Sequence, residues 1–203
     1  MMKEIFNKYI NLNKTNMVFG LLSACFFGLI AFDSNKYYPV ALLMAPSLLF
    51  SFVVGKMCYE EDSKSTKEFL LSLPIVKNKI ALEKNIVGQI CIFIGFIIVH
   101  LMFFYVNVIL KNTEMIFNIE MIFLVASFLI VYNTVYIFLN YKFDYSKTQF
   151  TSYIIVVLGL ALFKFGNDSM ALVNNLNSYI LVAVLIILSC TSLFITKNIK
   201  WES

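Results

Sequence analysis

The sixteen residues 91–106, CIFIGFIIVHLMFFYV, decide the fold class. His100 is the only strongly polar residue among them, and no proline interrupts them. A transmembrane β-strand alternates apolar and polar residues in segments of about ten, and this stretch does not alternate. Since a helix needs about 20 mainly apolar residues to cross the hydrocarbon core of a bilayer, the stretch predicts the centre of a transmembrane helix.

Similar apolar runs recur along the whole chain. Apolar residues make up 60% of it and charged residues 14%, and the mean hydropathy is +0.82. These values exclude a soluble globular domain. We predict an all-α membrane protein, a single transmembrane domain over residues 1–203 with six spans. The spans are expected at residues 17–32, 38–55, 86–110, 119–141, 150–166 and 178–196, the first and fifth being short.

The lysines predict the orientation. With six spans, thirteen lysines fall on the side that holds both termini, and two, Lys36 and Lys111, on the other; Lys164 lies near a helix end and can snorkel. The positive-inside rule therefore puts both termini in the cytoplasm. All sixteen basic residues are lysine, and Ile, Asn, Phe and Tyr are abundant. This composition suggests an AT-rich bacterial genome, hence a multi-pass protein of the bacterial cytoplasmic membrane.

The first 32 residues contain two patterns that predict helices. Residues 1–16 place apolar residues at near-helical spacing between lysines, which predicts an amphipathic helix on the membrane surface; a frayed terminus is the alternative. The first span carries Gly20, Ala24 and Gly28, a small residue at every fourth position. Such a face lets another helix approach closely, either within the chain or between subunits.

Two spans carry polar faces. In the third span, Gln89, His100 and Asn107 lie within about 20° of one another at 100° per residue, so this face should point into the bundle or toward a cavity. The fourth span has a similar set. Together the two faces are candidates for a translocation path, although interhelical hydrogen bonds explain them as well. The six candidate residues are Gln89, His100, Asn107, Asn133, Tyr136 and Asn140.

Several chemistries have no residues to carry them. The sequence contains no G-x-x-x-x-G-K-[ST] phosphate-binding loop and no H-E-x-x-H motif. His100 is the only histidine, and no pair of carboxylates falls within a span. We therefore expect no catalytic residue and no metal site, and any ATP-driven function would need a separate ATPase chain. The four cysteines are not closely paired and are expected to be small apolar packers.

A charged segment separates the second and third spans. Residues 56–85, KMCYEEDSKSTKEFLLSLPIVKNKIALEKN, hold six of the sixteen lysines and five of the twelve acidic residues. We call this segment the charged island. A polar stretch, the apolar Phe69–Leu73 and the break at Pro74 precede a basic amphipathic stretch. We expect two short helices that lie on the cytoplasmic membrane surface and present a ridge to a partner; a merely solvated loop is the alternative.

The charged island also carries a family resemblance. KEFLLSLPIVKNKIALEKNIVG, residues 67–88, resembles the segment E-x-L-L-S-L-P-[IV]-x-[RK]-x-x-[IV]-x-x-[AE]-K between the second and third spans of type-2 ATP-binding-cassette (ABC) permeases. It is similar in particular to the small six-span Gram-positive permeases that export peptides or give resistance to them, such as the phenol-soluble-modulin exporters. Asn78-Lys79 departs from the more basic pair that is common there.

The resemblance implies an exporter permease with an N-terminal elbow helix and a cytoplasmic coupling helix between spans 2 and 3. The coupling helix would seat in an ABC ATPase subunit, which would bind ATP and Mg²⁺. A second permease, identical or a sister chain, would complete the transporter, with an amphipathic peptide as cargo and no nucleic-acid partner. The residues carried over for ATPase coupling are Lys67, Glu68, Phe69, Leu70, Leu71, Ser72, Leu73, Pro74 and Lys77.

Two other kinds of function remain open. A membrane immunity or interaction protein would bind a toxic peptide or a partner without ATP-driven transport. A membrane-embedded enzyme would need a catalytic group that the sequence does not show.

Overall fold

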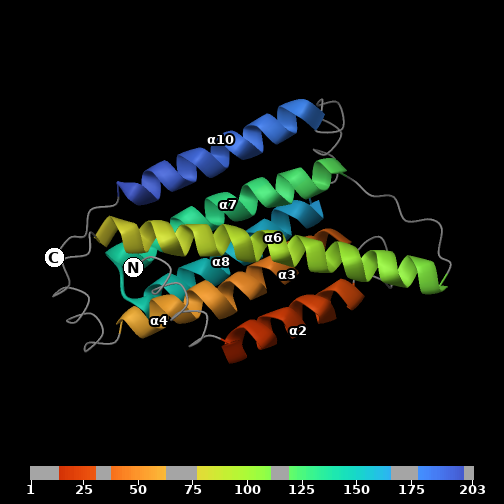
Figure 1. The fold of residues 1–203 in the computed structure, drawn as a ribbon, viewed down its shortest axis with the longest axis horizontal. Helices are drawn as coiled ribbons and strands as arrows, with labels where there is room; N and C mark the ends of the chain where they lie inside the picture. Colours follow the sequence, from red (N-terminus) through yellow and green to blue (C-terminus); the bar gives the residue numbers. More distant parts are fainter. Residues whose placement is uncertain (1–13, 31–37, 63–76, 111–118, 166–177, 199–203) are drawn as a thin grey trace.

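Helices make up all the regular structure in the described part of the chain. The computed structural model describes residues 14–30, 38–62, 77–110, 119–165 and 178–198. Its elements (Figure 1) are α2 (Lys14–Ile30), α3 (Tyr38–Phe50), the π-helical turn η3 (Ser51–Gly55), α4 (Lys56–Asp62), α6 (Lys77–Leu110), α7 (Ile119–Lys142), α8 (Tyr145–Phe165) and α10 (Ser178–Lys197).

The second helical segment is one rod with two irregularities. α3, η3 and α4 follow one another without a break from Tyr38 to Asp62. Pro46 lies inside α3, where its ring nitrogen cannot donate the usual helical hydrogen bond. The π-helical turn begins five residues later, and such turns occur often at functional sites. The prediction of one span over residues 38–55 did not include this turn, because nothing in SFVVG distinguishes it from α-helix.

Within the described ranges, four helical segments are long and apolar enough to cross a membrane, namely Val40–Asp62, Lys79–Tyr105, Met121–Lys142 and Ile180–Lys197. The described part of α2 contains a shorter apolar helix, Lys14–Phe27. α8 is not among the four, and its first half carries Ser, Thr, Gln and Lys. The all-helical membrane fold is therefore confirmed, whereas the count of six spans stays a prediction. The expected elbow helix falls mainly on residues 1–13, outside the described ranges.

More of the charged island belongs to the long helices than the sequence predicts. Its first seven residues form α4, which continues the second span, and its last nine belong to α6, which continues into the third. The expectation of two separate short helices was wrong for the described residues, since both flanking parts are continuous with the spans. The reason is that the helical backbone does not stop where hydropathy falls, and the charges find partners: Glu61 is 7% exposed and Lys84 0%. Only residues 63–76, outside the described part, remain between the two helices.

The centre of the bundle is an apolar core of α3, α6 and α7. Leu42, Phe50, Val99, Leu129 and Ile137 are fully buried there. α6 packs closely on α3 at Gly95, where a methyl group would lie 2.5 Å from the Cα of Pro46. The outer surfaces of α2, α6, α8 and α10 are also apolar, with Phe93 and Phe150 each 69% exposed. An exposed apolar surface of this extent is the one that lipid requires.

The two ends of the bundle differ in charge. α4 ends, α6 begins, α7 ends, α8 begins and α10 ends at the same end of the bundle (Figure 1). This end carries seven of the nine lysines in the described ranges, and the other two are Lys14 in α2 and Lys164 in α8. We call it the lysine-rich end. α6 and α10 lie close together there and splay apart toward the opposite end (Figure 1).

Candidate functional site

A buried ion pair joins the two helices on either side of residues 63–76. Lys84 of α6 pairs with Glu61 of α4, and the two side chains are 1% and 7% exposed. The Lys84 Nζ also donates to Asn140 Oδ1 of α7 at 3.4 Å and lies 5.0 Å from the ring centroid of Tyr141. A buried charge needs such partners, since an unpaired one would be strongly destabilising. The pair therefore fixes the end of α4 to α6 and α7.

Asn85, the next residue, joins α6 to α7 and α10. Its Nδ2 lies 2.8 Å from Ser192 Oγ, 3.1 Å from the Ser192 carbonyl and 3.0 Å from Thr196 Oγ1, all on α10. Its Oδ1 accepts from Asn133 Nδ2 of α7 at 2.6 Å and from Gln89 Nε2 at 3.3 Å. Asn85 is 0% exposed. Three helices are thus held at one point by a single amide.

The residues around Asn85 complete this polar network. Thr134 Oγ1 donates to Ser192 Oγ at 2.7 Å, and Asn133 Nδ2 also reaches the Asn85 carbonyl at 3.1 Å. Gly88 makes the approach of α7 possible, because a methyl group there would lie 2.8 Å from Asn133 Cγ. We call the set the polar hub. Its members are Glu61, Lys84, Asn85, Gln89, Asn133, Thr134, Asn140, Ser192 and Thr196.

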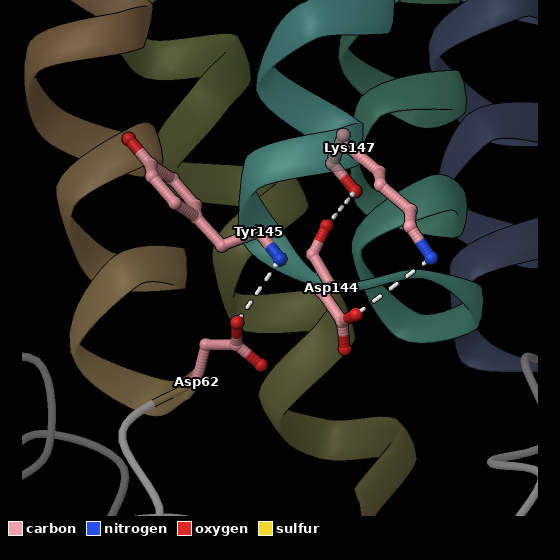
Figure 2. Close-up of polar contacts among 5 residues, drawn as sticks. Asp62, Asp144, Tyr145 and Lys147 are labelled. Atoms are coloured by element: carbon pink, nitrogen blue, oxygen red, sulfur yellow. Dashed lines mark hydrogen bonds and ion pairs between the residues drawn. The ribbon is translucent and has the colours of Figure 1, made fainter.

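The end of α4 also touches the start of α8. The carboxylate of Asp62 accepts a hydrogen bond from the backbone N–H of Tyr145 at 3.0 Å (Figure 2). The first N–H groups of a helix have no partner within it, so Asp62 serves as a capping group from another helix. Tyr59 packs edge-on against the Tyr145 ring, with centroids 5.2 Å apart. Partial burial raises the pKa of the Tyr145 phenol, which keeps it neutral.

A cavity of about 640 Å³ lies between α6, α7 and α10. Phe93, Ile97, Leu101 and Phe104 of its wall are 50–69% exposed, so the cavity adjoins the lipid-facing surface. Its polar lining residues are Gln89, His100 and Ser189. The remaining lining residues are apolar: Ile92, Phe93, Phe96, Ile97, Leu101, Phe104, Ile122, Phe123, Ala126, Ile130 and Leu185.

The six residues of the candidate translocation path lie in different surroundings in the structure. Gln89, Asn133 and Asn140 belong to the polar hub, and Gln89 and His100 line the cavity. The His100 Nδ1 lies 2.7 Å from the Phe96 carbonyl. Tyr136 packs edge-on against Phe50, with ring centroids 5.2 Å apart. The side chain of Asn107 lies outside the described part.

The other predicted residues are partly described. In α2, Gly20 packs on α3 and η3, where a methyl group would lie 2.7 Å from Leu49 Cδ1, and Ala24 is 0% exposed; this helix contact is within the chain. Gly28 lies in α2, but its surroundings are not described. Lys77 is the first residue of α6. The remaining residues of the coupling set, Lys67–Pro74, lie outside the described ranges.

Sequence reasoning missed the centre of the hub. Asn85 lies in the charged island, and the sequence analysis predicts no role for Ser192 or Thr196. A signal was available: Asn85 and Gln89 are four residues apart, as are Ser192 and Thr196, so each pair marks one polar helix face in an apolar setting. All four cysteines are free. Within the described ranges, no three His, Cys, Asp or Glu side chains gather as metal ligands.

Comparison with protein families decides the class. Over residues 5–200 the sequence matches the family model described as ABC-2 family transporter protein. The chain belongs to the ABC-2 transporter family. This ABC-2 protein is therefore a multi-pass membrane protein and a permease subunit of an ABC transporter, as its resemblance to type-2 permeases implied. Comparisons with curated proteins and with solved structures gave no match.

Proposed function

We propose that this permease exports amphipathic or antimicrobial peptides from a bacterial cell, driven by ATP that a separate ABC ATPase subunit binds with Mg²⁺ and hydrolyses. Membership of the ABC-2 family supports the permease role and implies the ATPase partner. Export of peptides is proposed from the resemblance of residues 67–88 to the peptide-exporting group, which includes the phenol-soluble-modulin exporters. A second permease, identical or a sister chain, completes the transporter.

The observation that carries the proposal is the polar hub next to the coupling segment. Residues 67–74 lie between α4 and α6 in the sequence, and Glu61 and Lys84 join these helices. Asn85 then links α6 to α7 and α10. A displacement that an ATPase imposes on α4 and α6 would pass directly to α7 and α10, because coupling travels through packed and hydrogen-bonded elements.

The charge distribution supports a cytoplasmic position for the lysine-rich end. Seven described lysines lie there, as the positive-inside rule requires of a cytoplasmic face. The ATPase acts from the cytoplasm, so the coupling segment and the hub would meet it on the same side. We assign both termini to this side.

A co-purification experiment tests the ATPase contact. The permease is expressed with the ATPase encoded beside it, and residues 70–74 are replaced by a Gly-Ser segment of equal length. The replacement is expected to abolish co-purification, whereas Asn198→Ala, at the exposed end of α10, leaves it intact. Co-purification that survives the replacement would refute the docking role.

A second experiment separates export from passive protection. Cells that carry the permease with an ATPase lacking its catalytic residue are challenged with an amphipathic peptide. Export requires that protection disappear with ATP hydrolysis. If protection persists, the chain acts as an immunity protein that binds the peptide.

A further inference from the structure

The cavity between α6, α7 and α10 combines an apolar wall with polar groups at bilayer depth. Eleven of its fourteen lining residues are apolar. Ser189 is nine residues from Ile180 and eight from Lys197, the ends of that candidate span, so its hydroxyl lies near the middle of the span. Lipid offers only hydrocarbon at this depth, and a polar group left without a hydrogen bond there costs free energy.

Two of these polar groups retain hydrogen-bonding capacity. Among the described residues, the Ser189 hydroxyl makes no hydrogen bond, whereas Thr191 on the same helix donates to the Leu188 carbonyl. Gln89 uses its Nε2 toward Asn85 and Ser192, and no described donor reaches its Oε1. Both residues line the cavity. An occupant that supplies hydrogen-bonding groups along an otherwise apolar body would satisfy them.

The dimensions fit one face of a helix. The lining residues of α6 run from Gln89 to Phe104 with the three- and four-residue spacing of one helical face. This part of α6 is roughly 22 Å long at 1.5 Å per residue. One turn of a helix with its side chains fills roughly 400–600 Å³, comparable to the volume of about 640 Å³. The cavity thus accepts the side chains of one helical face along α6 and not a whole helix.

We propose that this cavity binds the apolar face of an amphipathic helical peptide that enters from the lipid. Phe93, Ile97 and Leu101 hold the apolar side chains, and Ser189 and Gln89 hydrogen-bond a polar side chain of the peptide. A phospholipid tail fits less well because it has no hydrogen-bonding group at the depth of Ser189. This inference rests on the proposed function and gives the cargo a location on one permease chain.

The test uses the full permease in phosphatidylcholine–phosphatidylglycerol nanodiscs, without the ATPase. The probe is a synthetic 18-residue Leu/Lys amphipathic helix with one photoreactive leucine. Cross-links are expected on cavity residues of α6, α7 and α10. Ile97→Trp, on the half-exposed cavity wall, should reduce labelling at least 10-fold, whereas Ile187→Trp, on the exposed surface outside the cavity, should leave it unchanged.

The hydrogen bond has its own pair of variants. Ser189→Ala is expected to raise the Kd of the peptide about 2- to 10-fold, the range for one hydrogen bond, and Ser189→Thr should restore it. Equal labelling of the Ile97→Trp and Ile187→Trp variants overturns the proposal. The proposal is also overturned if a phospholipid with a photoreactive acyl chain labels the cavity and saturating peptide does not displace it. A chemical cross-link between a cavity residue and a second permease copy would overturn it as well. ATPase co-purification is measured on the same variants, so a failed cavity remains distinguishable from a failed permease assignment.

Discussion

Glu61 and Lys84 form a buried ion pair between the last turn of α4 and the beginning of α6. In the sequence the two residues flank the segment expected to bind the ATPase, so their contact holds together the two helices that this segment connects. Their burial also makes each dependent on the other, because removal of one residue leaves the other charge buried without its ion-pair partner.

Lys84→Met is expected to destabilise the permease by about 3–5 kcal/mol, since it leaves Glu61 buried without its charge partner. The double variant Glu61→Leu/Lys84→Met should lose much less than the sum of the single variants. Thermal unfolding in detergent micelles, read as a double-mutant cycle, measures the difference. Lys147→Met is the control, because Lys147 and Asp144 are 71% and 70% exposed. Additive single effects would contradict the pairing.

Asn85→Ala should separate ATPase binding from transport. The variant removes the contacts to Asn133, Ser192 and Thr196, and hydrogen bonds between membrane helices contribute about 0.6 kcal/mol each on average. We expect a stability loss of about 1–3 kcal/mol with unchanged ATPase co-purification, but a large loss of ATP-driven peptide uptake into inverted vesicles. Asn198→Ala, which removes one exposed hydrogen bond on α10, is the matched control. Full export by the Asn85→Ala variant would exclude the hub from coupling.

Asp62→Ala should loosen the start of α8. The carboxylate of Asp62 accepts the backbone N–H of Tyr145 (Figure 2), and loss of a capping acceptor costs about 0.5–2 kcal/mol. Hydrogen exchange of the Tyr145 amide is therefore expected to accelerate about 2- to 30-fold. Asp62→Asn keeps an acceptor oxygen and should recover most of the protection. An unchanged exchange rate in Asp62→Ala would show that the cap contributes nothing.

The sequence predicted the helices better than the contacts between them. Apolar runs placed the starts of α3, α7 and α10 at residues 38, 119 and 178, where the structure has them, because lipid imposes continuous hydrophobicity on a span. The extension of α6 back to Lys77 could not be seen in the same way. The sequence predicts a separate short helix there, whereas the structure makes it continuous with the span. Lys84 pairs with Glu61 of another helix, and the sequence does not reveal such a non-local contact.

The polar faces illustrate the same limit. Helical periodicity correctly put Gln89 and His100 on one face directed at a cavity. It could not tell that Asn133 and Asn140 face the hub, since this depends on how α7 is rotated against α6. Lys84 and Asn85 lie among charged residues, so their hydropathy predicts that they are exposed to solvent. Hydropathy takes no account of the partners on other helices that allow both side chains to be buried.

Gly95→Ala is expected to disturb the contact between α3 and α6. A methyl group at this position would lie 2.5 Å from the Cα and 2.9 Å from the Cβ of Pro46. Neither atom belongs to a flexible side-chain end, so the two helices must move apart, and overpacking of this kind costs about 1–3 kcal/mol. The thermal midpoint in detergent should fall accordingly. Gly55→Ala is the control, because its added methyl group would meet only the Tyr136 Oη at 3.4 Å, an ordinary contact distance. If both variants unfold at the wild-type temperature, α3 and α6 do not pack as closely as the structure shows.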